Sequence, residues 1–197
     1  MARNIEIKVR LADLKGTLRS ISEIAGDATE LWQEDTFFRC DIDNGRLKLR
    51  HETGASDASE FIFYVREDDS PDPKASNYLR CPVSSFDQLK DVLGAALGIV
   101  GRVVKHRYVF MIGNARVHVD EIAGLAGGFL EIEVVLGEAD SVESGYATMS
   151  SLMVQLGIDS SQLVAKAYVD LLVVEGRADW QSPGTTNAKN KIGRGSR

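Results

Sequence analysis

The segment "NIEIKVR", residues 4–10, separates apolar from polar side chains with a period of two. Successive side chains of a β-strand point to opposite faces, so Ile5, Ile7 and Val9 lie together on one face. The other face carries an amide, an acid and two bases: Asn4, Glu6, Lys8 and Arg10. This charged face is either solvated or part of a charged interior that holds a multiply charged ligand.

Four later segments also carry charged side chains on one strand face. Their charged faces carry Arg46, Lys48 and Arg50 in "RLKLR", Lys105 and Arg107 in "VVKHRYVF", Arg116, His118 and Asp120 in "RVHVDEI", and Glu131 and Glu133 in "FLEIEVV". A merely solvated face would accept Ser, Thr and Gln equally well, and these faces carry few of them. We therefore favour faces that point inward, where charges must be paired or bound to a ligand. Bases would then hold phosphate, and carboxylates would hold a divalent metal ion.

The periodicity of the whole chain predicts an α+β fold with hairpin-connected strands. Strands are predicted over residues 4–11, 30–41, 46–52, 59–67, 78–83, 101–112, 116–123 and 129–136. Helices are predicted over 12–25, 84–97, 140–157 and 161–174, and residues 68–77, with two prolines, are predicted to form a loop. Eight strands can close a barrel wide enough for one small ligand. Residues 1–175 are predicted to form one domain, and residues 176–197 a flexible basic tail.

Composition excludes several classes of protein. With 44% hydrophobic and 26% charged residues among 197, the chain is typical of a globular domain. Cys40 and Cys81 are too few and too far apart for a zinc site. The tail carries five bases and one acid, which leaves residues 1–175 with a net charge of −10 and argues against a nucleic-acid partner. No segment resembles a secretory signal or a membrane span, so we expect a cytoplasmic protein that does not bind a membrane.

Five motifs occur in an order that is familiar from one family: "IEIK", "LKLR", "VKHRYVF", "VHVDEI" and "GGFLEIE". With them, the chain resembles the CYTH superfamily over residues 3–174. This group contains class IV adenylyl cyclases and thiamine or inorganic triphosphatases, also called triphosphate tunnel metalloenzymes. The "GGFLEIE" segment and the K-x-R…D pair are most similar to the class IV adenylyl cyclase-like branch. The resemblance implies a closed, antiparallel eight-stranded β-barrel with surrounding helices, in which the charged faces point inward.

The resemblance also implies roles for individual residues. The expected ligands of Mg²⁺ or Mn²⁺ are Glu6, Asp120, Glu131 and Glu133. The expected phosphate-binding residues are Lys8, Lys48, Arg50, Arg66, Arg80, Lys105 and Arg107. The expected catalytic residues are Glu6, Lys8, Asp120 and Glu133. Arg66 replaces the usual lysine, and Asn4 replaces the first glutamate of the N-terminal motif; the neutral amide should lower metal affinity by ~10–100-fold.

The implied activity is that of a metal-dependent enzyme acting on a triphosphate. The first expectation is a class IV adenylyl cyclase, which converts ATP to cyclic AMP and pyrophosphate. The alternatives are a hydrolase of thiamine, nucleoside or inorganic triphosphate, and a non-catalytic module that binds polyphosphate or a nucleotide because of Asn4. A homodimer is implied by resemblance alone. His118 shares a face with Asp120, so it either assists proton transfer or is a hydrogen-bonded strand histidine.

Overall fold

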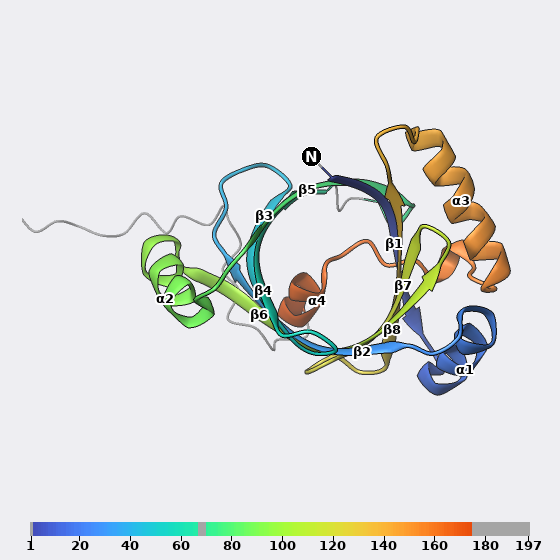
Figure 1. The fold of residues 1–197 in the computed structure, drawn as a ribbon, viewed down its shortest axis with the longest axis horizontal. Coiled ribbons are helices and arrows are strands. Elements are labelled where there is room, and N and C mark those ends of the chain that lie inside the picture. Colours follow the sequence, from blue (N-terminus) through green and yellow to red (C-terminus); the bar gives the residue numbers. More distant parts are fainter. Residues whose placement is uncertain (1, 67–69, 175–197) are drawn as a thin grey trace, which may run out of the picture.

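Eight strands close into a barrel in the described part of the chain, residues 2–66 and 70–174 of a computed structural model (Figure 1). The strands are β1 (Ala2–Leu11), β2 (Thr29–Phe38), β3 (Gly45–Gly54), β4 (Ala58–Val65), β5 (Lys74–Pro82), β6 (Ile99–Ile112), β7 (Ala115–Ile122) and β8 (Gly128–Leu136). Their order around the barrel is β1-β5-β4-β3-β2-β6-β7-β8, and β1 pairs with β8 to close it. All neighbouring strands are antiparallel, which confirms the predicted barrel.

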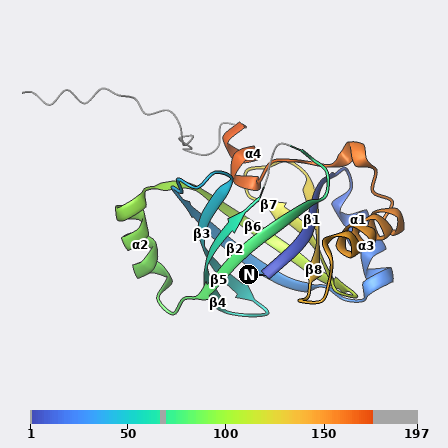
Figure 2. The ribbon, with the colours of Figure 1, turned by 90° about the horizontal axis from the view of Figure 1, so that it is seen from above.

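Helices cover the outside of the barrel and one of its ends. Figure 2 shows α1 (Leu14–Ala25) and α3 (Val142–Gln155) on one side, α2 (Phe86–Leu97) on the other, and α4 (Tyr168–Val174) over one end. The N-cap of α1 is Asp13, whose carboxylate accepts a hydrogen bond from the Gly16 amide at 2.9 Å. Among the described residues, no helix is long and apolar enough to cross a membrane.

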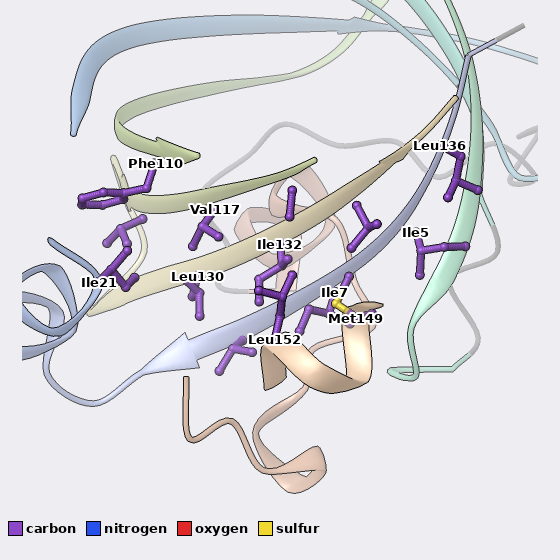
Figure 3. Close-up of a cluster of buried hydrophobic side chains, with 14 residues drawn as sticks. Ile5, Ile7, Ile21, Phe110, Val117, Leu130, Ile132, Leu136, Met149 and Leu152 are labelled. Atoms are coloured by element: carbon purple, nitrogen blue, oxygen red, sulfur yellow. The ribbon is translucent and has the colours of Figure 1, made fainter. Parts of the chain in front are cut away.

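The main hydrophobic core lies outside the barrel wall, between the strands and helices α1 and α3. Ile5, Ile7 and Val9 are 0%, 4% and 1% exposed and pack in this cluster with Met149 and Leu152 of α3 (Figure 3). Burying one such side chain contributes about 1.5–3 kcal/mol. Because the apolar face of β1 points outward, its charged face must point into the barrel, which answers the question raised by residues 4–10.

A second apolar cluster closes the barrel end beneath α4. Val103 of β6 and Phe129 of β8 contact Tyr168, Val169 and neighbouring side chains there. The Phe129 and Tyr168 rings meet edge to face, with centroids 5.1 Å apart. This contact holds α4 against the barrel end and places Tyr168 at the edge of the interior.

The prediction of a loop over residues 68–77 is wrong for its last four residues. Residues 74–77 belong to β5 and pair with β1, where Ala75 lies opposite Ile5 and Ser76 opposite Asn4. Small and polar residues have weak strand propensity, so tertiary pairing with β1 determines this segment. Residues 67–69 and the predicted tail, 176–197, lie outside the described residues.

The predicted helix over residues 161–174 is wrong in its first half. A short 3₁₀ turn covers Ser160–Gln162, and residues 163–167 then run in an extended path across the barrel end to α4. Leu163 forms a β-bridge with Val9, and the Val164 amide donates to the Lys8 carbonyl at 2.8 Å. These backbone bonds to β1 replace the bonds that a helix would have made.

Two glycines inside helices should respond oppositely to an added methyl group. A Cβ at Gly145 of α3 would lie 2.7 Å from both Ile5 Cγ1 and Leu136 Cδ2, whereas a Cβ at Gly94 of α2 would meet nothing closer than 3.4 Å. We expect Gly145→Ala to lower the free energy of unfolding by about 1–2 kcal/mol through overpacking. Gly94→Ala should raise it by about 0.5–1 kcal/mol through helix propensity. Urea denaturation measures both; equal effects of the two substitutions would contradict the packing of α3 on the barrel.

Candidate active site

The charged strand faces line a cavity of about 150 Å³ inside the barrel, and all eight strands contribute to its wall. Ten of the eleven predicted site residues line it: Glu6, Lys8, Lys48, Arg50, Arg66, Arg80, Lys105, Arg107, Glu131 and Glu133. The eleventh, Asp120, lies behind this surface and is fully buried. The structure therefore brings together side chains that are up to 127 positions apart in the sequence.

The acids gather where β1 pairs with β8. Glu6 lies directly opposite Glu133 in this pair, and Lys8 lies opposite Glu131. Burial raises the pKa of Glu6; the Arg66 guanidinium, 2.6 Å from its carboxylate, opposes the rise, and the charges of Glu133 and Glu131 add to it. Against the effect of burial, neighbouring bases lower the pKa of Glu133 to about 2 and hold the pKa of Glu131 well below its usual range, so both carboxylates are ionised and would bind an added cation in competition with those bases.

The bases gather on β3 and β6, around one buried acid, Asp35, on the strand between them, β2. The Asp35 carboxylate is 2.6 Å from Arg50 Nε, 3.1 Å from Lys48 Nζ and 3.5 Å from Lys105 Nζ. Burial, together with nearby Arg50, lowers the pKa of Lys48 to about 7. Burial, together with Arg107, lowers the pKa of Lys105 to about 8. Burial is the main cause of both shifts and the neighbouring cations add to it, so an anion bound there would be stabilised.

Asp120 orients Arg107 between the two clusters. Its carboxylate accepts both Arg107 Nε and Nη2, at 2.7 and 2.6 Å, and also the Tyr168 hydroxyl at 2.8 Å. Arg107 Nη2 donates in addition to Glu131 at 2.6 Å. Both oxygens of Asp120 are thus already engaged, and the geometry assigns it a positioning role for the guanidinium.

The residues on the acidic side fit a divalent cation. One ligand atom from each of His118, Glu131 and Glu133 lies within 4.8 Å of the other two. Two ligands of one metal ion at ~2.1 Å are at most about 4.2 Å apart, so small side-chain shifts suffice. The buried Asn4 side-chain oxygen has no hydrogen-bond partner in residues 2–66 and 70–174, and Asn4 lines the same cavity. Carboxylate and amide oxygens are the ligands that hard cations prefer.

The cavity continues toward an opening lined by residues of β2 through β8. A space of about 280 Å³ shares Arg50, Arg80 and Glu133 with the central cavity. Arg80 is half-exposed here, 3.6 Å from Glu60, so it lies nearer to solvent than the other predicted bases. Gln33 also lines this space, and its side-chain oxygen is buried without a hydrogen-bond partner among the described residues.

Among the cavity residues to which sequence reasoning assigned no role are Asp35, Tyr168, Arg116 and Gln33. Asp35 was hidden because acids occur on both faces of β2, with Glu30 and Glu34 on the opposite face. A signal was available for Arg116, which shares a face with His118 and lies 2.8 Å from Glu133. Tyr168 was predicted only as part of a helix over residues 161–174, and that pattern does not indicate which of its residues faces the cavity.

Comparison with known proteins gives one family. The model of the CYTH domain matches residues 2–168. No curated protein matches the chain. Among solved structures, PH1012 from Pyrococcus horikoshii is 21% identical with a TM-score of 0.75, and the match covers 85% of this chain and 98% of that one.

Two further structures of the same fold have named activities. A proposed adenylate cyclase from Vibrio parahaemolyticus is 14% identical with a TM-score of 0.66, over 86% of this chain and 97% of its own. HpAC1 from Hippeastrum, a proposed adenylyl cyclase described as having a dominant triphosphatase activity, is also 14% identical. Its TM-score is 0.57, over 90% of this chain and 97% of its own. These likenesses show the fold.

Removal of the buried acid Asp35 should be most costly while its lysine partners are charged. We expect Asp35→Asn to lower the free energy of unfolding by about 3–5 kcal/mol at pH 6, because it leaves three cations without a counter-charge. The loss should shrink at pH 9, where Lys48 and Lys105, with pKa values of about 7 and about 8, are neutral in the folded protein.

The control is the adjacent Glu34→Gln. Glu34 pairs with Arg102, whose side chain is 59% exposed, so the substitution should cost at most about 1 kcal/mol at either pH. Urea denaturation of the parent protein and both variants at both pH values measures the four changes in the free energy of unfolding. A loss for Asp35→Asn that does not depend on pH would contradict the proposed charge balance.

Proposed function

Because the chain belongs to the CYTH family, we propose that it is a metal-dependent enzyme that acts on a triphosphate. The single observation that supports this most strongly is the division of the cavity into a basic side around Lys48, Arg50 and Lys105 and an acidic side around Glu131 and Glu133. A triphosphate chain bound with a divalent cation has the complementary distribution of charge.

The basic residues would bind and orient the phosphates. Arg50 and Arg107 are held by bidentate contacts with Asp35 and Asp120, so their guanidinium planes are fixed before a ligand arrives. Fixed donors stabilise developing negative charge without reorganisation during the reaction. Lys8 lines the same cavity, and its Nζ lies 3.3 Å from Glu131 Oε1. From this position its ammonium group would contact either the carboxylate or a phosphate oxygen of the ligand.

The acidic residues would hold the cation, with Glu131 and Glu133 as principal ligands and Glu6 beside them. A divalent cation there lowers the pKa of an attacking hydroxyl or water and neutralises phosphate charge. Asp120 acts through Arg107 in this proposal. Asn4 offers a neutral oxygen on the same strand face as Glu6, which weakens the site without removing it.

For the reaction itself we propose the cyclase chemistry, in which the 3′-hydroxyl of ATP attacks the α-phosphorus and pyrophosphate leaves. Gln33 supports an organic substrate, because its unpartnered amide oxygen, beside the opening, is suited to accept a hydrogen bond from an amino group such as that of adenine. Hydrolysis by a bound water uses the same residues and is the alternative. HpAC1, of the same fold, is described as having a dominant triphosphatase activity.

The products distinguish these reactions. The purified protein is incubated with ATP, thiamine triphosphate or inorganic triphosphate and Mn²⁺ or Mg²⁺, and cyclic AMP is separated from ADP and phosphate by chromatography. We expect cyclic AMP and pyrophosphate from ATP, and at least a ~100-fold lower rate for Glu133→Gln, since a cation ligand is lost. The matched control is Glu143→Gln, an exposed acid of α3. An unchanged rate for Glu133→Gln would contradict the proposed site.

A binding module without chemistry is the second candidate, and Asn4 is the observation that favours it. The same assay tests this candidate with Asn4→Glu, which adds an anionic oxygen beside Glu6. Tight triphosphate binding without turnover in both proteins would establish the module. A large gain of turnover in Asn4→Glu would instead identify an enzyme whose metal site has been weakened.

Binding of a triphosphate should be accompanied by uptake of protons above pH 8. Lys48 and Lys105, with pKa values of about 7 and about 8, are largely neutral at pH 8.5, and a bound polyanion raises both values. Affinity should therefore fall as pH rises through this range. Calorimetry of inorganic triphosphate binding in two buffers of different ionisation enthalpy measures the protons. The Lys48→Arg variant should take up fewer protons on binding than the parent protein. The control variant Lys90→Arg, on the outer helix α2, should take up the same number as the parent protein.

A further inference from the structure

His118 is the one histidine of the described chain that lines the interior cavities. It lies on β7 directly opposite Glu131 of β8, and its side chain is 6% exposed. Its Nδ1 atom is buried and has no hydrogen-bond partner in residues 2–66 and 70–174. The nearest acidic oxygen, Glu133 Oε1, is 3.7 Å away, which is too long for a hydrogen bond. A buried polar atom without a partner is costly, so its retention needs an explanation.

A cation between the imidazole and the two glutamates would supply that partner. The three ligand atoms already lie within 4.8 Å of one another. Arg116 donates to Glu133 Oε2, at 2.8 Å, and so leaves Oε1 as the oxygen that faces the imidazole. Arg107 and Lys8 both contact Glu131, at 2.6 and 3.3 Å. Any cation at this place must therefore compete with three fixed positive charges.

That competition affects different metal ions differently. Mg²⁺ is bound almost entirely through charge and oxygen ligands, and it loses water reluctantly. The neighbouring bases weaken that attraction, and Asn4 contributes a neutral oxygen where an acid would have helped. An imidazole nitrogen suits Co²⁺, Ni²⁺ and Zn²⁺, whose affinity gains from the donor itself as well as from charge, whereas Mn²⁺ prefers oxygen ligands as Mg²⁺ does.

We propose that His118 is a ligand of the tunnel cation together with Glu131 and Glu133, and that its nitrogen makes the site select a first-row transition metal ion over Mg²⁺. The inference rests on the proposed function, because it concerns the cation of the same cavity. It adds a nitrogen donor to a site whose other candidate ligands are oxygens.

The experiment measures metal binding directly, without a nucleotide and without turnover. Tag-free protein is titrated with Co²⁺, followed by visible absorption, with Mn²⁺, followed by loss of the free-ion electron paramagnetic resonance signal, and with Mg²⁺, followed by calorimetry. We expect His118→Gln to weaken Co²⁺ binding by tenfold or more and to change the Co²⁺ spectrum, and to weaken Mn²⁺ binding less. Mg²⁺ binding should change by less than about twofold, so the preference is lost.

The control is His106→Gln, on the outer wall, where the ring stacks on Trp32 with centroids 4.6 Å apart. It should leave all three affinities and the Co²⁺ spectrum unchanged, and circular dichroism of each variant checks the fold. The proposal is overturned if the parent protein binds Co²⁺ no more tightly than Mg²⁺. It is also overturned if His118→Gln lowers all affinities equally or alters none.

The test separates this inference from the proposed function. Histidine-dependent Co²⁺ binding in a protein that turns over no triphosphate would support the inference and reject the enzyme. Triphosphate turnover with a metal preference that is the same in the parent protein and in His118→Gln would support the enzyme and reject the inference.

Discussion

Charge confined within a closed wall is the constraint on which the rest of this structure depends. Strand alternation sends one side chain in two into the barrel, and the interior ones are mostly ionic. Moving charged side chains out of water costs free energy, and this cost is offset only where opposite charges or hydrogen bonds lie beside them. Asp35 and Asp120 provide part of this compensation, each bound to at least one arginine. The compensation is incomplete around Lys48 and Lys105, whose pKa values stay lowered, and this leaves room for an anionic ligand.

The placement of the apolar core outside the wall follows from the same constraint. Ile5, Ile7 and Val9 pack against α1 and α3, so most hydrophobic stabilisation is independent of what lines the bore. Side chains such as Asn4 or Arg66 can therefore differ from a family pattern without disturbing the core. Stability and chemistry are carried by opposite faces of the same strands.

The sequence was sufficient to predict the barrel and ten of its lining residues because alternation and motif order both carry local information. It was insufficient where position depends on distant partners. Residues 74–77 form a strand because they pair with β1. Residues 163 and 164 are extended because their backbones bond to β1. Asp35 could not be singled out, since its role is visible only when β3 and β6 lie beside β2. The unpartnered nitrogen of His118 likewise depends on tertiary structure.

The extended crossing over residues 163–167 carries a consequence for evolution of the chain. Its main-chain carbonyls at Ala165 and Lys166 accept hydrogen bonds from Lys74 and Lys8, at 3.1 and 3.0 Å. Carbonyl groups persist through any exchange of side chain, so these two anchors tolerate sequence drift in the crossing. They do not tolerate a change in its length, because an inserted or deleted residue would move both acceptors away from the lysines at once. Insertions and deletions, more than substitutions, should therefore be selected against in this segment.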